Sequence, residues 1–365
     1  MAQAALAFDT PAPRLPGALA TRTVPSSARS SAAPDGDLAF ELGWDHAHHG
    51  LVPPTEHLLP ANPLRQGWEA GRSCFGNRTL KPTRQVRKWL QLRLSAWLRG
   101  RAFETVQVTP HYLAQIDNEH CPITRLALTH GSGEDTDASV DRVSNQAGYA
   151  AGNLAVMSVR ANQSKADLRW SDARLQAVLA EARKGGAGAG TANGLTSAEW
   201  ARLAVLMSFV TPLPHDIAAT LPMLVLPPNR LRLLNPIQGL QALITLQLAQ
   251  EGFAARIAQL ASMLPGLELR RDFHLFFHSL LPRAWDGGRP DGRIQLRERL
   301  EDAWRNTDVL RRWQRFATQL SAEQAELLVQ RAVAKGLMGR PSQFQILRPE
   351  SATEGWALET AGAQA

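Results

Sequence analysis

The stretch SVDRVSNQAGYAAGNLAVMSVRANQSK, residues 139–165, decides how the middle of this chain folds. The run ASVDRV at 138–143 is typical of a short strand, as is CPITRLALTH at 121–130, and the acidic loop GSGEDTD joins the two runs. A helix is expected to follow over 153–168. The sequence therefore predicts strand, strand and helix in this order.

Three short motifs in this stretch are more specific than its hydrophobic pattern. They are Ser-x-Asp-Arg followed by an apolar residue, Gly-Tyr-x-x-x-Asn, and Ala-Asn-x-x-Lys. With FETVQVTPHYLAQID and CPITRLALT upstream, they make residues 103–168 resemble the HNH endonucleases, a group of His-Me finger nucleases, in a version common in phages and prophages. The resemblance covers only the middle of the chain. It implies a small ββα-metal finger that hydrolyses phosphodiester bonds in DNA.

The resemblance also implies roles for individual residues. Asp141 and Asn162 would hold one divalent cation, and their hard oxygen ligands suit Mg²⁺ or Mn²⁺. Asn153 would orient the catalytic base, and Lys165 would contact a phosphate of the substrate. Such a cation would neutralise charge on the scissile phosphate and on the leaving oxygen.

Arg142 departs from the family pattern, because it stands where a catalytic histidine would deprotonate water. A guanidinium stays protonated and cannot act as a general base, although it binds phosphate strongly. One interpretation takes the base from elsewhere, with His130 as the first candidate and His120 and His111 after it. A second lets a metal-bound water react without a protein base. In a third interpretation, the module binds nucleic acid without cutting it. If the site is catalytic, the candidate residues are His130, Arg142 and Asn153.

A basic amphipathic helix is predicted before the finger, over residues 78–101. Residues 63–108 contain ten Arg or Lys side chains against two acids, Glu69 and Glu104. The polar face of the helix carries Arg84, Arg87, Lys88 and Arg99. We expect these four cations to contact the phosphate backbone of DNA, and RNA remains an equal candidate on charge alone.

The predicted fold class is α+β, in which helices flank the finger and an all-α domain follows it. The predicted segments are a disordered tail (1–37), an N-terminal segment with the basic helix (38–102), the HNH-like module (103–184), a Gly/Ala linker (185–195), an all-helical domain (196–347) and a frayed tail (348–365). The helical domain is a candidate surface for a protein partner.

The net charge of +7 favours a polyanionic partner. Cys74 and Cys121 are the only cysteines, so we expect neither a disulfide framework nor a structural zinc. No apolar run is long enough to cross a membrane, and we expect a cytoplasmic protein without a membrane partner. The first hypothesis is a metal-dependent HNH-like endonuclease. The alternatives are a catalytically inactive nucleic-acid-binding protein and an assembly protein whose helical half carries the function.

Overall fold

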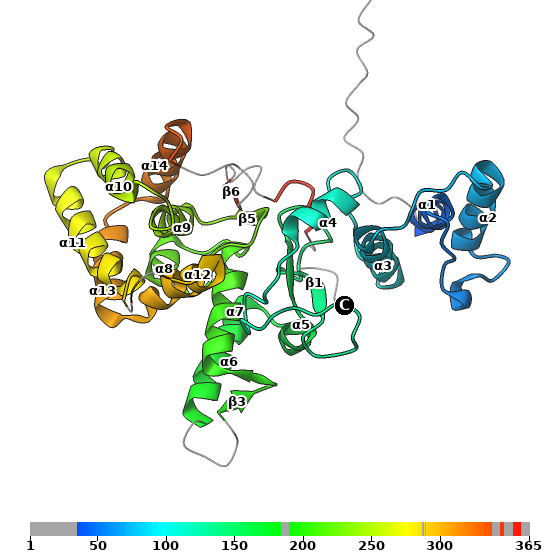
Figure 1. Cartoon of the computed structure of the whole chain (residues 1–365), viewed down its shortest axis with the longest axis horizontal. Helices are drawn as coiled ribbons and strands as arrows, with labels where there is room; N and C mark the ends of the chain where they lie inside the picture. Colours follow the sequence, from blue (N-terminus) through cyan, green and yellow to red (C-terminus); the bar gives the residue numbers. More distant parts are fainter. Residues whose placement is uncertain are drawn as a thin grey trace, which may run out of the picture. The chain divides into compact units, whose positions relative to one another are not determined.

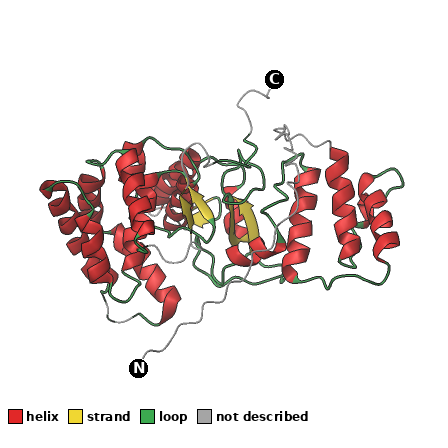
Figure 2. Cartoon of the chain, turned by 90° about the horizontal axis from the view of Figure 1, so that it is seen from above, coloured by secondary structure: helices red, strands yellow, loops and turns green. Residues whose placement is uncertain are grey.

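Helices alternate with three two-stranded sheets in the part of the chain that the computed structural model describes (Figures 1 and 2), so the predicted α+β class is confirmed. The described residues are 35–183, 190–286, 288, 290–337, 344–346 and 353–358. The predicted tail 1–37 lies outside them, apart from its last three residues, which begin the first helix.

The N-terminal segment consists of helices α1 (Asp35–His48), α2 (Pro63–Phe75) and α3 (Arg84–Leu98), with the short turn η1 (Thr55–His57). The first two helices approach closely, because a Cβ on Gly67 would lie 1.9 Å from the carbonyl oxygen of Phe40. The basic helix α3 starts later than predicted. Thr83 caps it by accepting a hydrogen bond from the amide of Val86.

The segment predicted to form a finger contains strands β1 (Ala138–Arg142) and β2 (Leu154–Ser158), which pair antiparallel, and helix α5 (Val159–Lys165), and we use the word finger for this segment only as a label. The order strand, strand, helix is therefore present, but its elements are displaced from their predicted positions. The predicted strand 121–130 is a loop with isolated bridges, and the start of the predicted helix 153–168 forms β2. The helix begins only after Ser158, whose hydroxyl accepts from the amide of Ala161.

The β1–β2 hairpin separates two hydrophobic clusters. Leu154 and Val156 face the smaller cluster, which includes residues of α3 and of helix α4 (Pro110–Ile116). Ala155 and Met157 face the larger cluster, which continues into the C-terminal helices. Successive side chains of a strand point to opposite faces, so β2 is buried on both sides and shows no polar alternation.

The C-terminal half is helical for most of its length. Its elements are α6 (Trp170–Ala182), α7 (Ser197–Phe209), α8 (His215–Thr220), α9 (Pro236–Gln247), α10 (Phe253–Ser262), α11 (Leu267–Ala284), α12 (Gly292–Asp302), η3 (Ala303–Arg305), α13 (Thr307–Ala317) and α14 (Ala322–Ala334). The prediction of a purely helical region over 196–347 is wrong, because β5 (Leu231–Leu233) pairs in parallel with β6 (Phe344–Ile346).

The predicted linker 185–195 contains ordered structure at its end. Strands β3 (Thr191–Ala192) and β4 (Leu195–Thr196) form a hairpin that turns at Asn193 and Gly194, both with positive φ. The indole of Trp200 donates a hydrogen bond of 2.7 Å to the carbonyl of Ala192 and fixes this hairpin to α7. Residues 185–189 of the predicted linker lie outside the described part.

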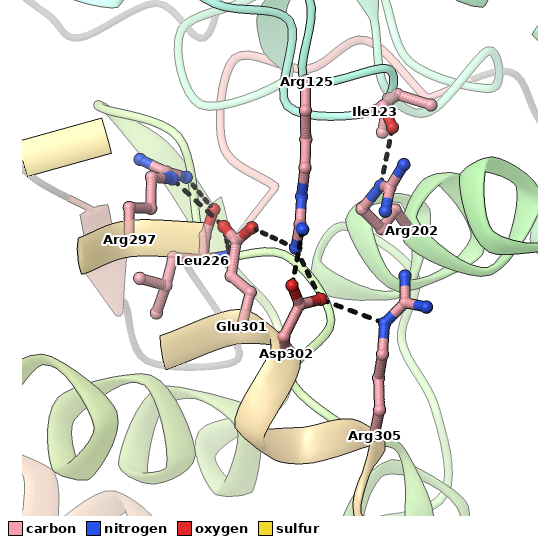
Figure 3. Close-up of polar contacts among 8 residues, drawn as sticks. All are labelled: Ile123, Arg125, Arg202, Leu226, Arg297, Glu301, Asp302 and Arg305. Carbon is pink, nitrogen blue, oxygen red and sulfur yellow. Dashed lines mark hydrogen bonds and ion pairs between the residues drawn. The ribbon is translucent and has the colours of Figure 1, made fainter. Parts of the chain in front are cut away.

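The hydrophobic core does not divide at this position, since one cluster runs from Ile123 of the finger to Trp304 and Phe316 of the helical half. A polar network adds to the junction (Figure 3). Arg125 binds Asp302 in bidentate fashion, with N···O distances of 2.8 and 3.0 Å. Nearby, Nε of Arg202 donates to the carbonyl of Ile123 at 2.6 Å. The finger and the helices therefore form one packed body.

The predicted frayed tail 348–365 is wrong for residues 353–358. Trp356 is 1% exposed, and its indole donates a 3.0 Å hydrogen bond to the carbonyl of Ala151. Its own carbonyl accepts from the amide of Gly148 at 2.7 Å. A buried aromatic side chain with its polar atom satisfied is sufficient to order this short segment.

Candidate nucleic-acid interface

A groove of about 600 Å³ runs between helix α3 and the finger, and we call it the basic groove. Its helical side is one stripe of α3, made of Lys88, Gln91 and Ser95, and continues beyond the helix with the C-cap residue Arg99 and with Arg101. Its opposite side includes Ser139, Asp141, Arg142, Asn145, Tyr149, Asn162 and Asp167. The fold thus brings Lys88 and Arg99 of the predicted basic face to the same groove as the predicted metal ligands, whereas Arg84 and Arg87 line a different hollow.

Asp141 lies at the inner end of the groove and is only 9% exposed. Its carboxylate is 3.0 Å from the Nζ atom of Lys165. Burial raises the pKa of Asp141 above its ordinary value, and the positive charges of Lys165 and Arg142 oppose this shift. The charged partner of this carboxylate is thus already present in the chain.

Lys165 is fully buried, and this contradicts its predicted role as a phosphate contact. Besides its ion pair with Asp141, its ammonium donates to the carbonyl of Arg142 at 2.9 Å and to Oδ1 of Asn145 at 3.0 Å. Two hydrogen bonds and one ion pair thus engage the buried ammonium. Lys165 therefore ties α5 to the end of β1 and cannot also reach a ligand.

Arg142 and Asn153 shape the loop between the strands. The guanidinium of Arg142 donates to the carbonyl of Ala147 at 3.0 Å and lies over the ring of Tyr149 at 5.1 Å. Asn153 is completely buried; its amide nitrogen donates to the carbonyls of Ser144 and Gly148, and its oxygen accepts from the amide of Ser144. Asn153 thus binds the loop with both of its polar atoms, and Arg142 does so with Nη1, so the structure shows both residues holding the loop.

Asn162 is half-buried on α5, and its amide nitrogen donates to the hydroxyl of Ser139 at 2.8 Å. Its position on the groove with Asp141 agrees with the placement that the resemblance implied. The carboxylate of Asp141 accepts no hydrogen bond from the described residues at its buried Oδ2, but Lys165 already supplies the positive charge beside it, so a divalent cation at this pair would have to displace the ammonium. Three His, Cys, Asp or Glu side chains do not converge as a metal site anywhere in the described residues.

His130 lines a different hollow, of about 330 Å³, which we call the loop cavity. The remaining residues around it are Arg84, Gln85, Arg87, Lys88, Gln91, Leu113, Asp117, Gly131, Ala138, Val140 and Val156. The structure thus places His130 beside the basic helix and not beside Asp141. Its predicted role as the base for a water at Asp141 does not fit this position.

The cations of α3 fall into two groups. Arg84 is paired with Asp117, and Arg93, which is 2% exposed, is paired with Asp45. Within the described residues, by contrast, no carboxylate lies within 4 Å of the charged atoms of Arg87, Lys88 or Arg99. Burial lowers the pKa of Lys88, partly offset by the charge of Asp137. These three are the groups that remain able to bind an anion.

Gln91 and Ser95 were not singled out from the sequence, although helical spacing places them with Lys88 and Arg99. Comparison of the chain with protein-family models, with curated proteins and with solved structures finds no match. The resemblance to HNH endonucleases therefore rests on the motifs within residues 103–168 alone.

Proposed function

We propose that this protein binds nucleic acid through its phosphate backbone, along helix α3 and the basic groove, on a scaffold that resembles an HNH finger. The observation that carries the proposal is the position of Lys88 on α3 and of Arg99 at its C-cap, both lining the groove without a carboxylate within 4 Å among the described residues. An unpaired cation on a concave surface favours phosphate, and each contact formed releases counterions from the nucleic acid.

The finger contributes shape to this interface more than chemistry. Arg142, Asn153 and Lys165 hold the loop between the strands and the start of the groove, as their hydrogen bonds indicate. None of the described helices has the length and apolar character needed to span a bilayer. We place the activity in the cytoplasm, where the free thiols of Cys74 and Cys121 would stay reduced.

The test is a binding titration with labelled DNA and RNA over a series of salt concentrations. Replacing Lys88→Ala or Arg99→Ala should weaken binding and reduce the slope of log K against log salt by about 1 for each phosphate that is no longer neutralised. Arg331→Ala is the matched control, because Arg331 is exposed on α14 and removes the same charge elsewhere. Equal effects of all three substitutions would refute the groove as the binding site.

Phosphodiester hydrolysis is the second candidate, favoured by the shared position of Asp141 and Asn162 on the groove. It requires Asp141 to give up its contact with Lys165. Incubation of plasmid and single-stranded DNA with Mg²⁺, Mn²⁺ or a chelator tests it, with Asp141→Asn and Arg331→Ala as a pair. Cleavage that needs metal and is abolished only by Asp141→Asn would establish the nuclease, whereas binding that is unaffected by the chelator, without cleavage, favours the first proposal.

A further inference from the structure

The loop cavity combines a cationic rim with an apolar floor. The exposed Arg87 and the half-buried Lys88 of α3 line it, and we call them its rim; the half-buried Val140 and the buried Leu113 and Val156 also line it, and we call them its floor. Gln85, Gln91 and His130, which can recognise a polar edge, complete the lining with Arg84 and Asp117, which are paired with each other. A purely electrostatic phosphate site would need no apolar floor, so this hollow suits a ligand that has both an anionic and a flat apolar part.

We propose that the loop cavity receives one unpaired nucleotide of the bound strand, with its base against the apolar floor and its phosphate at Arg87 and Lys88. The proposal rests on the proposed function, because it extends the backbone path of the basic groove. The two hollows share Lys88, Gln91 and Val140, so a strand that lies in the groove reaches the cavity without leaving the surface.

The size of the cavity supports a single nucleotide. Its volume of about 330 Å³ lies at the lower end of the range for small-molecule sites, roughly 300–1,000 Å³. A paired base is stacked within a duplex and cannot enter such a hollow unless it is extruded. The expected preference is therefore for single strands, or for duplexes with an unpaired or mismatched base.

The lining also indicates how the base would be held. Trp89, the nearby aromatic residue of α3, donates its indole N–H to the carbonyl of Val108 and is part of the core. His130 is the ring that lines the cavity itself. Recognition would thus depend on apolar contact with Val140 and Leu113, on stacking with His130, and on the free amide hydrogens of Gln91, whose oxygen faces Lys88 at 3.5 Å.

The test compares a short single-stranded oligonucleotide with its duplex of equal length. Ala138→Phe fills the cavity from β1 without removing a cation, because the side chain of Ala138 lines it. We expect this variant to bind the single strand roughly tenfold or more weakly, about the effect of removing one stacked base, while duplex affinity stays unchanged. Arg99→Ala should weaken both, and circular dichroism with thermal melting checks the fold of each variant.

The outcomes separate the two proposals. An absence of binding to either probe would refute the proposed function, whereas duplex binding with no loss of single-strand affinity in Ala138→Phe would refute the nucleotide pocket alone. If Ala138→Phe does not fold, 2-aminopurine placed along the strand provides a second measurement with the unaltered protein. One position should report an unstacked, solvent-protected base, and uniform fluorescence at every position would overturn the inference.

Discussion

The ammonium of Lys165 lies 3.0 Å from the carboxylate of Asp141, the residue that the HNH resemblance implies as a ligand of a divalent cation. Both side chains are nearly excluded from solvent, at 0% and 11% exposure. A buried pair of this kind adds little net stability compared with apolar residues, but removing one partner leaves an uncompensated charge. The pair therefore holds the geometry of the finger, and this makes it testable.

Lys165→Met should destabilise the protein by about 3 kcal/mol, because Asp141 would remain buried without its counter-charge. Chemical denaturation measures the free energy of unfolding. The double variant Asp141→Asn with Lys165→Met should recover part of the loss. The exposed Lys335 provides the control variant Lys335→Met. If Lys165→Met lowers the free energy of unfolding no more than this control does, the structural role of Lys165 is contradicted.

Asn153→Ala should cost about 2 kcal/mol, because it leaves buried backbone groups of the loop without their hydrogen-bond partners. The groups affected are the amide and carbonyl of Ser144 and the carbonyl of Gly148. If Asn153 instead orients a reacting group, the substitution would spare stability and remove only activity. Thermal unfolding measured beside nucleic-acid binding distinguishes these outcomes.

As pH rises, nucleic-acid affinity should begin to fall at a lower pH than it would if Lys88 had the ordinary pKa of a lysine. Burial lowers the pKa of Lys88, and only its protonated form attracts phosphate, so affinity is full below that pKa and falls as pH rises through it. Lys88→Arg should remove the decline, because a guanidinium stays charged. A titration of affinity against pH that is identical for both proteins would exclude Lys88 from the interface.

At acid pH, protonation of Asp137 should lower the stability of the folded protein. Hydrogen bonds from Ser132 and Thr129 hold the pKa of this carboxyl far below its ordinary value, so its stabilisation is complete above the unfolded value of about 3.8 and is lost as pH falls below it. Asp137→Asn should flatten the dependence of the melting temperature on pH in that acid range. Asp135→Asn, an exposed neighbour in the same loop, serves as the control and should leave the dependence intact.

Helix starts were readable from the sequence wherever a capping side chain marks them. Thr109 with Pro110 begins α4, and the pair Thr196 and Glu199 forms the capping box of α7. These signals are local, since the partners lie within one turn. The Asn193-Gly194 dipeptide was an equally local hairpin signal, but the glycine-rich composition around it suggested a linker.

Strand β2 was not readable, because LAVMS is buried on both faces and lacks the alternation that distinguishes a strand from a helix. The residues of the candidate interface show the same limit of prediction from sequence. Asp141 and Asn162 could be placed together from the motif, whereas the burial of Lys165 depends on the path of the loop that follows β1. Contacts with Asn145 and Arg142 decide its role, and no spacing rule predicts them.

Trp356 completes the loop of the finger from a point 205 residues beyond its hydrogen-bond acceptor, Ala151. A ribosome adding 5–20 residues per second needs roughly 10 to 40 seconds to cover that distance. During synthesis, therefore, the strands of the finger are made early, whereas Ala151 and Gly148 have no hydrogen bond to Trp356 until that residue is added. The nascent chain carries an unfinished loop for that interval, and a pause in translation over the helical half would prolong it.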